Sequence, residues 1–163
     1  MTQKHTISVI VENEFGVLAR VAGLFSGRGY NIETLSVASS LDPTLSRMTI
    51  TTSGDVAVIE QIIKHLNKLI NVIKVQDVTS ENPVNRILAM IKINLGQKNM
   101  EQLKTIILPF QGIIIYQDER CSIVQVVAEE GILQEAINTL KPYSIMEFVS
   151  TGNLAIQKGR SAL

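Results

Sequence analysis

Residues 5–25 read HTISVIVENEFGVLARVAGLF, and the hydrophobic period changes partway along this stretch. Between Ile7 and Val11, apolar residues alternate with polar ones, which is the period-two pattern of a half-buried strand. From Val17 onward, apolar residues recur at the spacing of one helix face, and Gly16 lies in the turn between the two patterns. The stretch therefore predicts a strand that passes through a tight turn into an amphipathic helix.

The same two patterns continue through the rest of the first half. Gly29 is placed to end the first helix with a left-handed residue. The patterns then predict a second strand at residues 31–39 and a third at 45–52. They predict a second helix at residues 59–70 and a fourth strand at 71–78. The order βαββαβ places two helices on one face of a four-stranded antiparallel sheet, which is the ferredoxin-like arrangement.

The second half of the chain repeats this order of elements. Residues 79–84 are mostly polar, contain Pro83 and are predicted to be a linker. Strand and helix patterns then follow at residues 86–94, 98–108, 112–117, 121–128, 131–140 and 144–150. The fold class is therefore α+β, with two tandem ferredoxin-like βαββαβ domains at residues 1–78 and 85–163.

The composition excludes several classes of protein. The 15 basic and 15 acidic residues give a formal net charge of zero, so we expect no nucleic-acid partner, because such proteins carry a basic surplus. The sequence has no signal peptide pattern and no run near the roughly 20 apolar residues of a membrane helix. We therefore expect a soluble intracellular protein that binds no membrane.

The reactive residues form no recognisable catalytic motif. Cys121 is the single cysteine, and neither His5 nor His65 lies in a nucleophile motif or a zinc-site spacing with it. Gly27 and Gly29 end a helix, whereas the glycines of a dinucleotide site must open one. The guanidinium group of Arg47 is able to bind a ligand carboxylate, but we expect it to form an ion pair or to face solvent. We predict that the chain is not an enzyme and holds no metal.

Two turns are candidates for binding a small molecule. Gly16 permits close approach to the backbone, and the first turn of the following helix offers unpaired N–H groups to a carboxylate. Asn13 lies beside that turn and either contacts an ammonium group or simply caps the helix. Asn31 is a polar residue at the start of the second strand, and it either contacts a ligand or bonds its own backbone in a turn.

Four blocks of sequence, in order, resemble one family. The blocks are ENEFGVLARVAGLFS, RGYNIETLSVA, DPTLSRMTI and LNKLINVIKV, at residues 12–26, 28–38, 42–50 and 66–75. They resemble the small subunit of acetohydroxyacid synthase, also called acetolactate synthase, whose N-terminal half is an ACT domain. The second half matches less closely, since the chain reads VNRIL at 84–88 and lacks an arginine before Thr151 and Gly152.

The resemblance implies a non-catalytic regulatory subunit of branched-chain amino acid biosynthesis, on the route to valine and isoleucine. Such a subunit activates a large catalytic subunit and confers feedback inhibition by valine, although leucine or isoleucine would fit a similar apolar cleft. Thiamine diphosphate, FAD and Mg are expected on the catalytic subunit, and no cofactor is expected in this chain. The location implied is the cytoplasm, or the plastid stroma if the gene is a plastid gene.

The resemblance also implies where the effector binds. ACT domains of the family dimerise side by side, and the effector lies between the turn before the first helix of one chain and the start of the second strand of the other. On this sequence the effector-binding positions are Asn13, Gly16, Val17, Leu18, Asn31 and Ile32. The alternative is a stand-alone ACT-domain sensor of amino acids that acts on another target.

Overall fold

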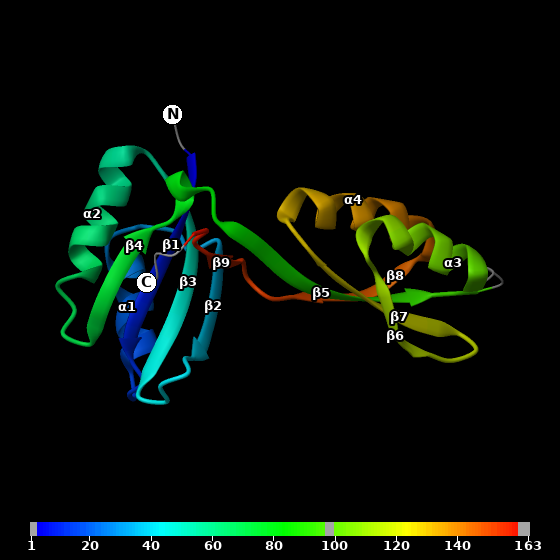
Figure 1. Cartoon of the computed structure of the whole chain (residues 1–163), viewed down its shortest axis with the longest axis horizontal. Coiled ribbons are helices and arrows are strands. Elements are labelled where there is room, and N and C mark those ends of the chain that lie inside the picture. Colours follow the sequence, from blue (N-terminus) through cyan, green and yellow to red (C-terminus); the bar gives the residue numbers. More distant parts are fainter. Residues whose placement is uncertain (1–2, 97–99, 160–163) are drawn as a thin grey trace. The chain divides into compact units, whose positions relative to one another are not determined.

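The computed structural model describes residues 3–96 and 100–159. The chain forms two compact units, which are drawn in Figure 1. The first unit combines residues 3–84 with 152–159, and the second consists of residues 85–151. Residues 152–159, which were predicted to belong to the second domain, thus lie with the first unit. The predicted helix positions 98 and 99 lie outside the described residues.

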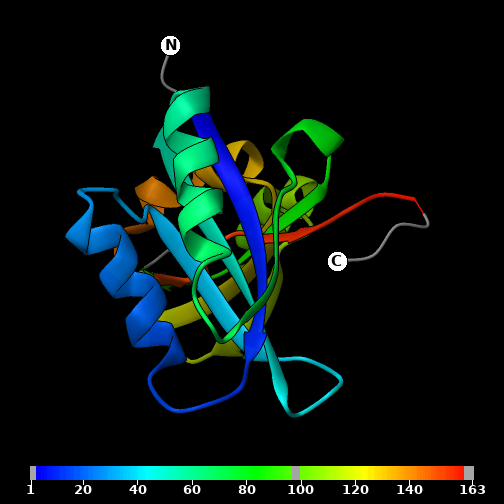
Figure 2. The ribbon, with the colours of Figure 1, turned by 90° about the vertical axis from the view of Figure 1, so that its left-hand side faces the viewer.

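The first unit has the predicted βαββαβ order. Its elements are β1 (Gln3–Glu12), α1 (Val17–Gly27), β2 (Thr34–Ser39), β3 (Leu45–Gly54), α2 (Val56–Leu66) and β4 (Val72–Asp77). The strands form an antiparallel sheet in the order β2-β3-β1-β4, so β2 and β4 are the edge strands. Figure 2 shows α1 and α2 side by side on one face of this sheet. The ferredoxin-like arrangement is confirmed.

The core of the first unit lies between this sheet and its two helices. The alternating apolar residues of β1 face the helices, with Ile7 opposite Ile50 and Val9 opposite Met48 on β3. Phe25 of α1 is fully buried. The inward strand positions are β-branched or long aliphatic residues, so their burial removes apolar surface from water. Each Å² of this surface stabilises the fold by about 25 cal/mol. The period-two pattern of the sequence therefore identified the face that forms the core.

The ends of the helices follow local signals. Gly29 has a positive φ of 72° beyond the end of α1, as its position predicted. The carboxylate of Asp55 accepts a hydrogen bond from the N–H of Val58 at 2.9 Å and so caps α2. The predicted extension of this helix to Ile70 was wrong. The helix ends at Leu66, and the side chain of Ile70 is 88 % exposed in the following turn.

The face of the first sheet away from the helices carries mostly hydroxyl side chains. Ser8, Thr49 and Thr51 lie on this face and are buried. Residues 152–156, here called the C-terminal strap, lie across it and include the short strand β9 (Leu154–Ile156). The side chain of Ala155 is also buried. A strand at this position was not predicted, because three residues are too few to show a period.

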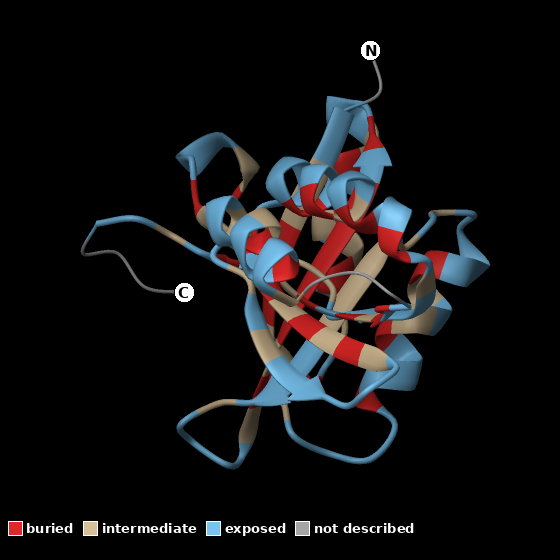
Figure 3. Cartoon of the chain, turned by 90° about the vertical axis from the view of Figure 1, so that its right-hand side faces the viewer, coloured by how far each residue is buried: buried red, intermediate tan, exposed pale blue. Residues whose placement is uncertain are grey.

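The second unit has the same topology. Its elements are β5 (Val84–Asn94), α3 (Met100–Ile107), β6 (Ile113–Gln117), β7 (Cys121–Ala128), α4 (Glu130–Leu140) and β8 (Ile145–Ser150). The strands pair antiparallel in the order β6-β7-β5-β8. Along β5 and β7 buried positions alternate with intermediate or exposed ones, as the coloured bands of Figure 3 show. Ile91, Ile93, Leu103 and Leu140 form the centre of its core.

Short helical turns join several of these elements. They are the 3-10 helices η1 (Thr79–Glu81), η2 (Leu108–Phe110) and η3 (Lys141–Tyr143). The first lies in the segment that was expected to be a linker, and residues 79–84 belong to the first unit. In the part of the chain that the structure describes, no helix is long and apolar enough to cross a membrane.

Candidate functional site

Asn13 lies in the turn between β1 and α1. Its backbone N–H donates to the carbonyl of Thr44 at 2.7 Å, and its side-chain Nδ2 donates to the carbonyl of Pro43 at 2.9 Å. Both acceptors belong to the turn between β2 and β3. Asn13 therefore joins two turns at one end of the sheet and does not cap α1, so the capping alternative is excluded.

The N-terminus of α1 has no side-chain cap from its own N-cap residue. That residue is Gly16, which has a φ of 79° and no side chain, and the Val17 N–H donates to the Glu14 carbonyl at 3.4 Å. Helix geometry leaves the first-turn amides without intrahelical acceptors, and the helix dipole adds a partial positive charge there. A carboxylate is the ligand group that suits such an end. The left-handed φ is accessible to glycine at little cost, which explains why glycine occupies this position.

Val17 and Leu18 begin the helix but differ in their surroundings. The side chain of Val17 is buried in the core of the first unit. The side chain of Leu18 is 44 % exposed. Of these two predicted residues, only Leu18 presents its side chain to solvent, and the Val17 N–H donates to the Glu14 carbonyl at 3.4 Å.

A buried asparagine supports the turn from the other side. Asn71 is only 7 % exposed, and its Nδ2 donates to Glu12 Oε2 at 2.6 Å and to Glu14 Oε2 at 3.3 Å. Its Oδ1 accepts a hydrogen bond from the guanidinium of Arg20 on α1. The Glu12 N–H donates to the Asn71 carbonyl at 2.9 Å. Asn71 was not predicted as a site residue, and the signal in the sequence was an asparagine at the first position of the predicted strand 71–78.

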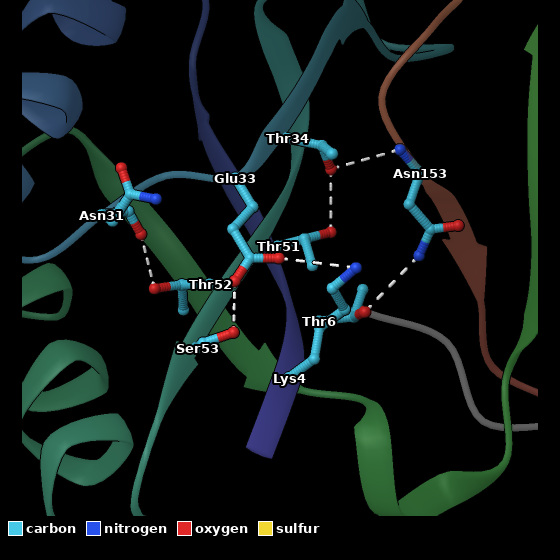
Figure 4. A network of polar contacts seen from close by, with 9 residues as sticks. All are labelled: Lys4, Thr6, Asn31, Glu33, Thr34, Thr51, Thr52, Ser53 and Asn153. Carbon is cyan, nitrogen blue, oxygen red and sulfur yellow. Dashed lines mark hydrogen bonds and ion pairs between the residues drawn. The ribbon is translucent and has the colours of Figure 1, made fainter. Parts of the chain in front are cut away.

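Asn31 and Ile32 lie before β2, at a second place. The Asn31 carbonyl accepts a hydrogen bond from Thr52 Oγ1 at 2.6 Å. The Asn31 residue is exposed, whereas Ile32 is partly buried against the core. Figure 4 shows this region, in which Glu33 forms an ion pair with Lys4 at 3.4 Å and accepts a hydrogen bond from Ser53. The start of β2 is therefore tied to both β1 and β3.

Within one chain these two places lie at opposite ends of the sheet. The turn at Asn13 follows the end of β1, where Glu12 pairs with Leu45. Asn31 bonds to Thr52, near the other end of β3. Thr52 lies seven positions after Leu45 along the strand, which at roughly 3.3 Å per residue is about 23 Å. A single chain therefore does not bring Asn13 and Asn31 to one small ligand.

The side chains of Arg47 and Cys121 are held by contacts within the fold. Arg47, which is half-buried, donates from Nη2 to the carbonyl of Ala155 at 2.9 Å and to Ser8 Oγ at 3.3 Å, where an ion pair or a solvent-facing side chain was expected. Cys121 Sγ donates to Asp118 Oδ2 at 3.4 Å, and burial, followed by this contact, raises the pKa of the thiol. A raised pKa lowers the thiolate fraction and hence the reactivity.

The pKa values of Asp118 and His65 are also shifted, and the two residues do not belong to one catalytic group. Hydrogen bonds from the N–H groups of Arg120 and Cys121 lower the pKa of Asp118 to about 2. Loss of solvation, followed by the charges of Arg28 and Lys68, lowers the pKa of His65. Across residues 3–96 and 100–159, no group of three or more His, Cys, Asp or Glu side chains is placed to hold a metal ion.

Known proteins resemble the chain along nearly all of its length. The family described as "AHAS small subunit-like ACT domain" matches residues 7–74, and "Small subunit of acetolactate synthase" matches residues 86–159. The probable acetolactate synthase small subunit of Archaeoglobus fulgidus is 42 % identical over 156 residues, covering 96 % of this chain and 98 % of the relative. The acetolactate synthase small subunit of Aquifex aeolicus is 39 % identical over 160 residues, covering 98 % and 83 %.

A solved structure agrees with these relatives. The crystal structure of the acetolactate synthase small subunit from Thermotoga maritima superposes with a TM-score of 0.89 at 33 % identity, covering 98 % of this chain and 99 % of that one. The likeness therefore includes both units and confirms the resemblance that the four sequence blocks indicated. This chain belongs to the small-subunit family of acetolactate synthase.

Proposed function

We propose that this chain is the regulatory subunit that raises the activity of the large catalytic subunit of acetolactate synthase and makes it sensitive to valine. Family membership along the whole chain supports the first part of the proposal. Thiamine diphosphate, FAD and Mg belong to the catalytic subunit in this scheme, which operates in the cytoplasm, or in the stroma for a plastid gene. Valine sensitivity then regulates the synthesis of branched-chain amino acids.

The observation that carries the effector part is the N-terminus of α1 behind Gly16, where the N-cap residue supplies no side chain to the first-turn amides. The carboxylate of valine accepts hydrogen bonds from the first-turn N–H groups and gains from the helix dipole. The side-chain oxygen of Asn13 is an acceptor for the ammonium group. The isopropyl group packs against the exposed part of Leu18 and, from a second chain, Ile32.

The second chain is required because one chain separates the two halves of the site. β2 is an edge strand, so two copies are able to join their sheets through antiparallel β2 strands about a twofold axis. In that pairing, the start of β2 in one copy lies beside the end of β2 in the other. The end of β2 and the turn at Asn13 share one end of the sheet, because Ser39 pairs with Ser46 and Ser46 with Val11. Asn31 of one copy then approaches Asn13 of the other.

Inhibition requires valine to bind one state of the complex more tightly than another. A coupling free energy of about 1–3 kcal/mol, or a factor of roughly 5–150 in affinity, is typical for such regulation. A site divided between two chains suits this role, because a small change in the dimer changes the distance between its halves.

The test is acetolactate formation by the purified large subunit from the same source, with and without this chain, over a titration of valine. We expect stimulation by the chain and reversal of that stimulation by valine. Asn13→Ala and Asn31→Ala should each weaken the valine effect, while Gln134→Ala on the exposed face of α4 should not. Parallel titrations with leucine and isoleucine identify the effector.

Two results would contradict the proposal in different ways. Stimulation that no amino acid reverses would retain the subunit assignment and remove the effector site. The absence of both a complex and a change in rate would remove the subunit assignment, and a stand-alone sensor would then be the better description.

A further inference from the structure

The C-terminal strap packs on β2 without any space between them. A Cβ atom placed on Gly152 would lie 2.8 Å from Ser36 Oγ, 2.9 Å from the carbonyl carbon of Leu35 and 3.0 Å from its nitrogen. Two of these three atoms are backbone, so they cannot rotate away. Among the amino acids, only glycine fits at this contact.

The next residue of the strap bridges two strands. The Asn153 N–H donates to Thr34 Oγ1 at 3.4 Å, and its Nδ2 donates to Thr6 Oγ1 at 3.4 Å, as Figure 4 shows. Thr34 Oγ1 in turn donates to Thr51 Oγ1 at 2.8 Å. The position of Asn153 therefore depends on the relative positions of β1, β2 and β3.

The strap is anchored further along by Arg47 of β3, which donates to the Ala155 carbonyl at 2.9 Å. On its other side the strap follows directly from the second unit. The Thr151 N–H donates to the Leu88 carbonyl at 2.9 Å, and Thr151 Oγ1 accepts from the Leu88 N–H at 3.1 Å. One peptide bond thus separates a residue fixed in the second unit from Gly152, which is fixed on β2.

The strap meets β2 close to the proposed effector site. Thr34, to which Asn153 donates, is the first residue of β2 and lies three positions after Asn31. A ligand that shifts Asn31 and Ile32 must therefore shift Thr34 or deform the bonds around it. Because Gly152 is packed tightly against Leu35 and Ser36, a shift of β2 also moves the strap.

We propose that the C-terminal strap transmits effector binding at the start of β2 to the second unit, through the packing of Gly152 on Leu35 and the bridge formed by Asn153. This inference rests on the proposed function of the Asn31 and Ile32 site. It assigns the regulatory coupling to a segment that makes no contact with the effector itself.

The variant that tests the strap is Gly152→Ala, because its added methyl group forces the strap away from β2. The matched control is Gly131→Ala on α4, where an added Cβ meets no atom within 4 Å. A second variant, Asn153→Ala, removes the bridge without adding volume. Each full-length variant is mixed with the catalytic subunit, and stimulation, valine inhibition and direct valine binding by calorimetry are measured.

We expect Gly152→Ala to keep its stimulation within twofold of the unchanged chain and to bind valine within about threefold. The valine concentration for half inhibition should rise at least tenfold, a change within the usual range of allosteric coupling. Asn153→Ala should change inhibition in the same direction by a smaller factor, and Gly131→Ala should match the unchanged chain.

The inference would be overturned if valine inhibited the complex that contains Gly152→Ala at the same concentrations as the complex with the unchanged chain. A parallel loss of valine binding and inhibition would also overturn it, because the strap would then support the site without transmitting its state. If the unchanged chain confers no valine inhibition, the proposed function fails and this inference fails with it. The first two results leave the proposed function intact.

Discussion

At the scale of single residues, the site depends on backbone conformations and buried polar contacts. Gly16 adopts a left-handed φ, and Asn71 connects Glu12, Glu14 and Arg20 behind the turn. The glycine was recognisable from the sequence, because a glycine between a strand pattern and a helix pattern indicates a turn. The role of Asn71 was not, because its partners lie more than 50 positions away in the sequence.

Gly16→Ala tests the conformational requirement at the N-cap. An added Cβ at Gly16 meets no atom within 4 Å, so the cost comes from the left-handed backbone alone, and we expect a loss of about 1–2 kcal/mol in the free energy of unfolding. Gly23→Ala is the control, since it also has open space but lies inside α1 with an ordinary φ. It should stabilise the chain by up to about 1 kcal/mol. Urea unfolding of both variants measures the difference, and equal effects would contradict the explanation.

Asn71→Ala tests the buried network. Its loss leaves Glu12 and Arg20 without an amide partner in a partly buried place, so we expect a loss of about 1–3 kcal/mol. Asn138→Ala, at an exposed position of α4, should change the free energy of unfolding by less than about 0.5 kcal/mol. Thermal unfolding measures both. A stability close to that of the unchanged chain would mean that the network does not support the turn.

At the scale of elements, both sheets arise from strands with period-two patterns, and the helices cover one face of each. The boundaries of β1, β3 and α1 lie within about two residues of the predictions, because turns and glycines mark them. β2 begins at Thr34 instead of residue 31, since residues 31–33 lead into the strand through contacts with β3. An edge strand such as β2 offers unpaired backbone groups, which is the physical basis for the proposed dimer.

Val37→Lys tests the proposed β2 interface. A lysine on an edge strand opposes the pairing of a second strand, so we expect the dimer dissociation constant to rise at least tenfold. The same change on the other edge strand, Ile73→Lys on β4, is the control. The two side chains are comparably exposed, at 42 % and 57 %. Sedimentation velocity measures the masses, and dissociation by Ile73→Lys but not Val37→Lys would place the interface on β4.

At the scale of the whole molecule, the chain leaves the first unit after Val84 and returns to it at Gly152. The returning segment bonds to hydroxyl groups of the first sheet, since Asn153 donates to Thr6 and Thr34. The last predicted element ended at residue 150, and the residues after it were predicted to belong to the second domain. That boundary was a reasonable expectation, because consecutive elements usually pack within one domain.

Deletion of residues 152–163 tests the structural contribution of this return. The deletion removes the carbonyl acceptor of Arg47 and the bridge made by Asn153. We expect a loss of about 1–3 kcal/mol in the unfolding of the first unit, with retained secondary structure. Circular dichroism and hydrogen exchange at β1, β2 and β3 measure this. Unchanged protection of these strands would show that the strap adds no stability.

The order of the elements, the faces that form the two cores, and the family were all readable from the sequence. Periodicity reports which face of a strand or helix is buried, and this information is local. The tertiary structure alone decided that Asn13 and Asn31 lie at opposite ends of one sheet, that Asn71 supports the turn, and that Gly152 packs on Leu35. These contacts join residues distant in the chain, and they depend on strand register and on the space between packed segments, which no local pattern records.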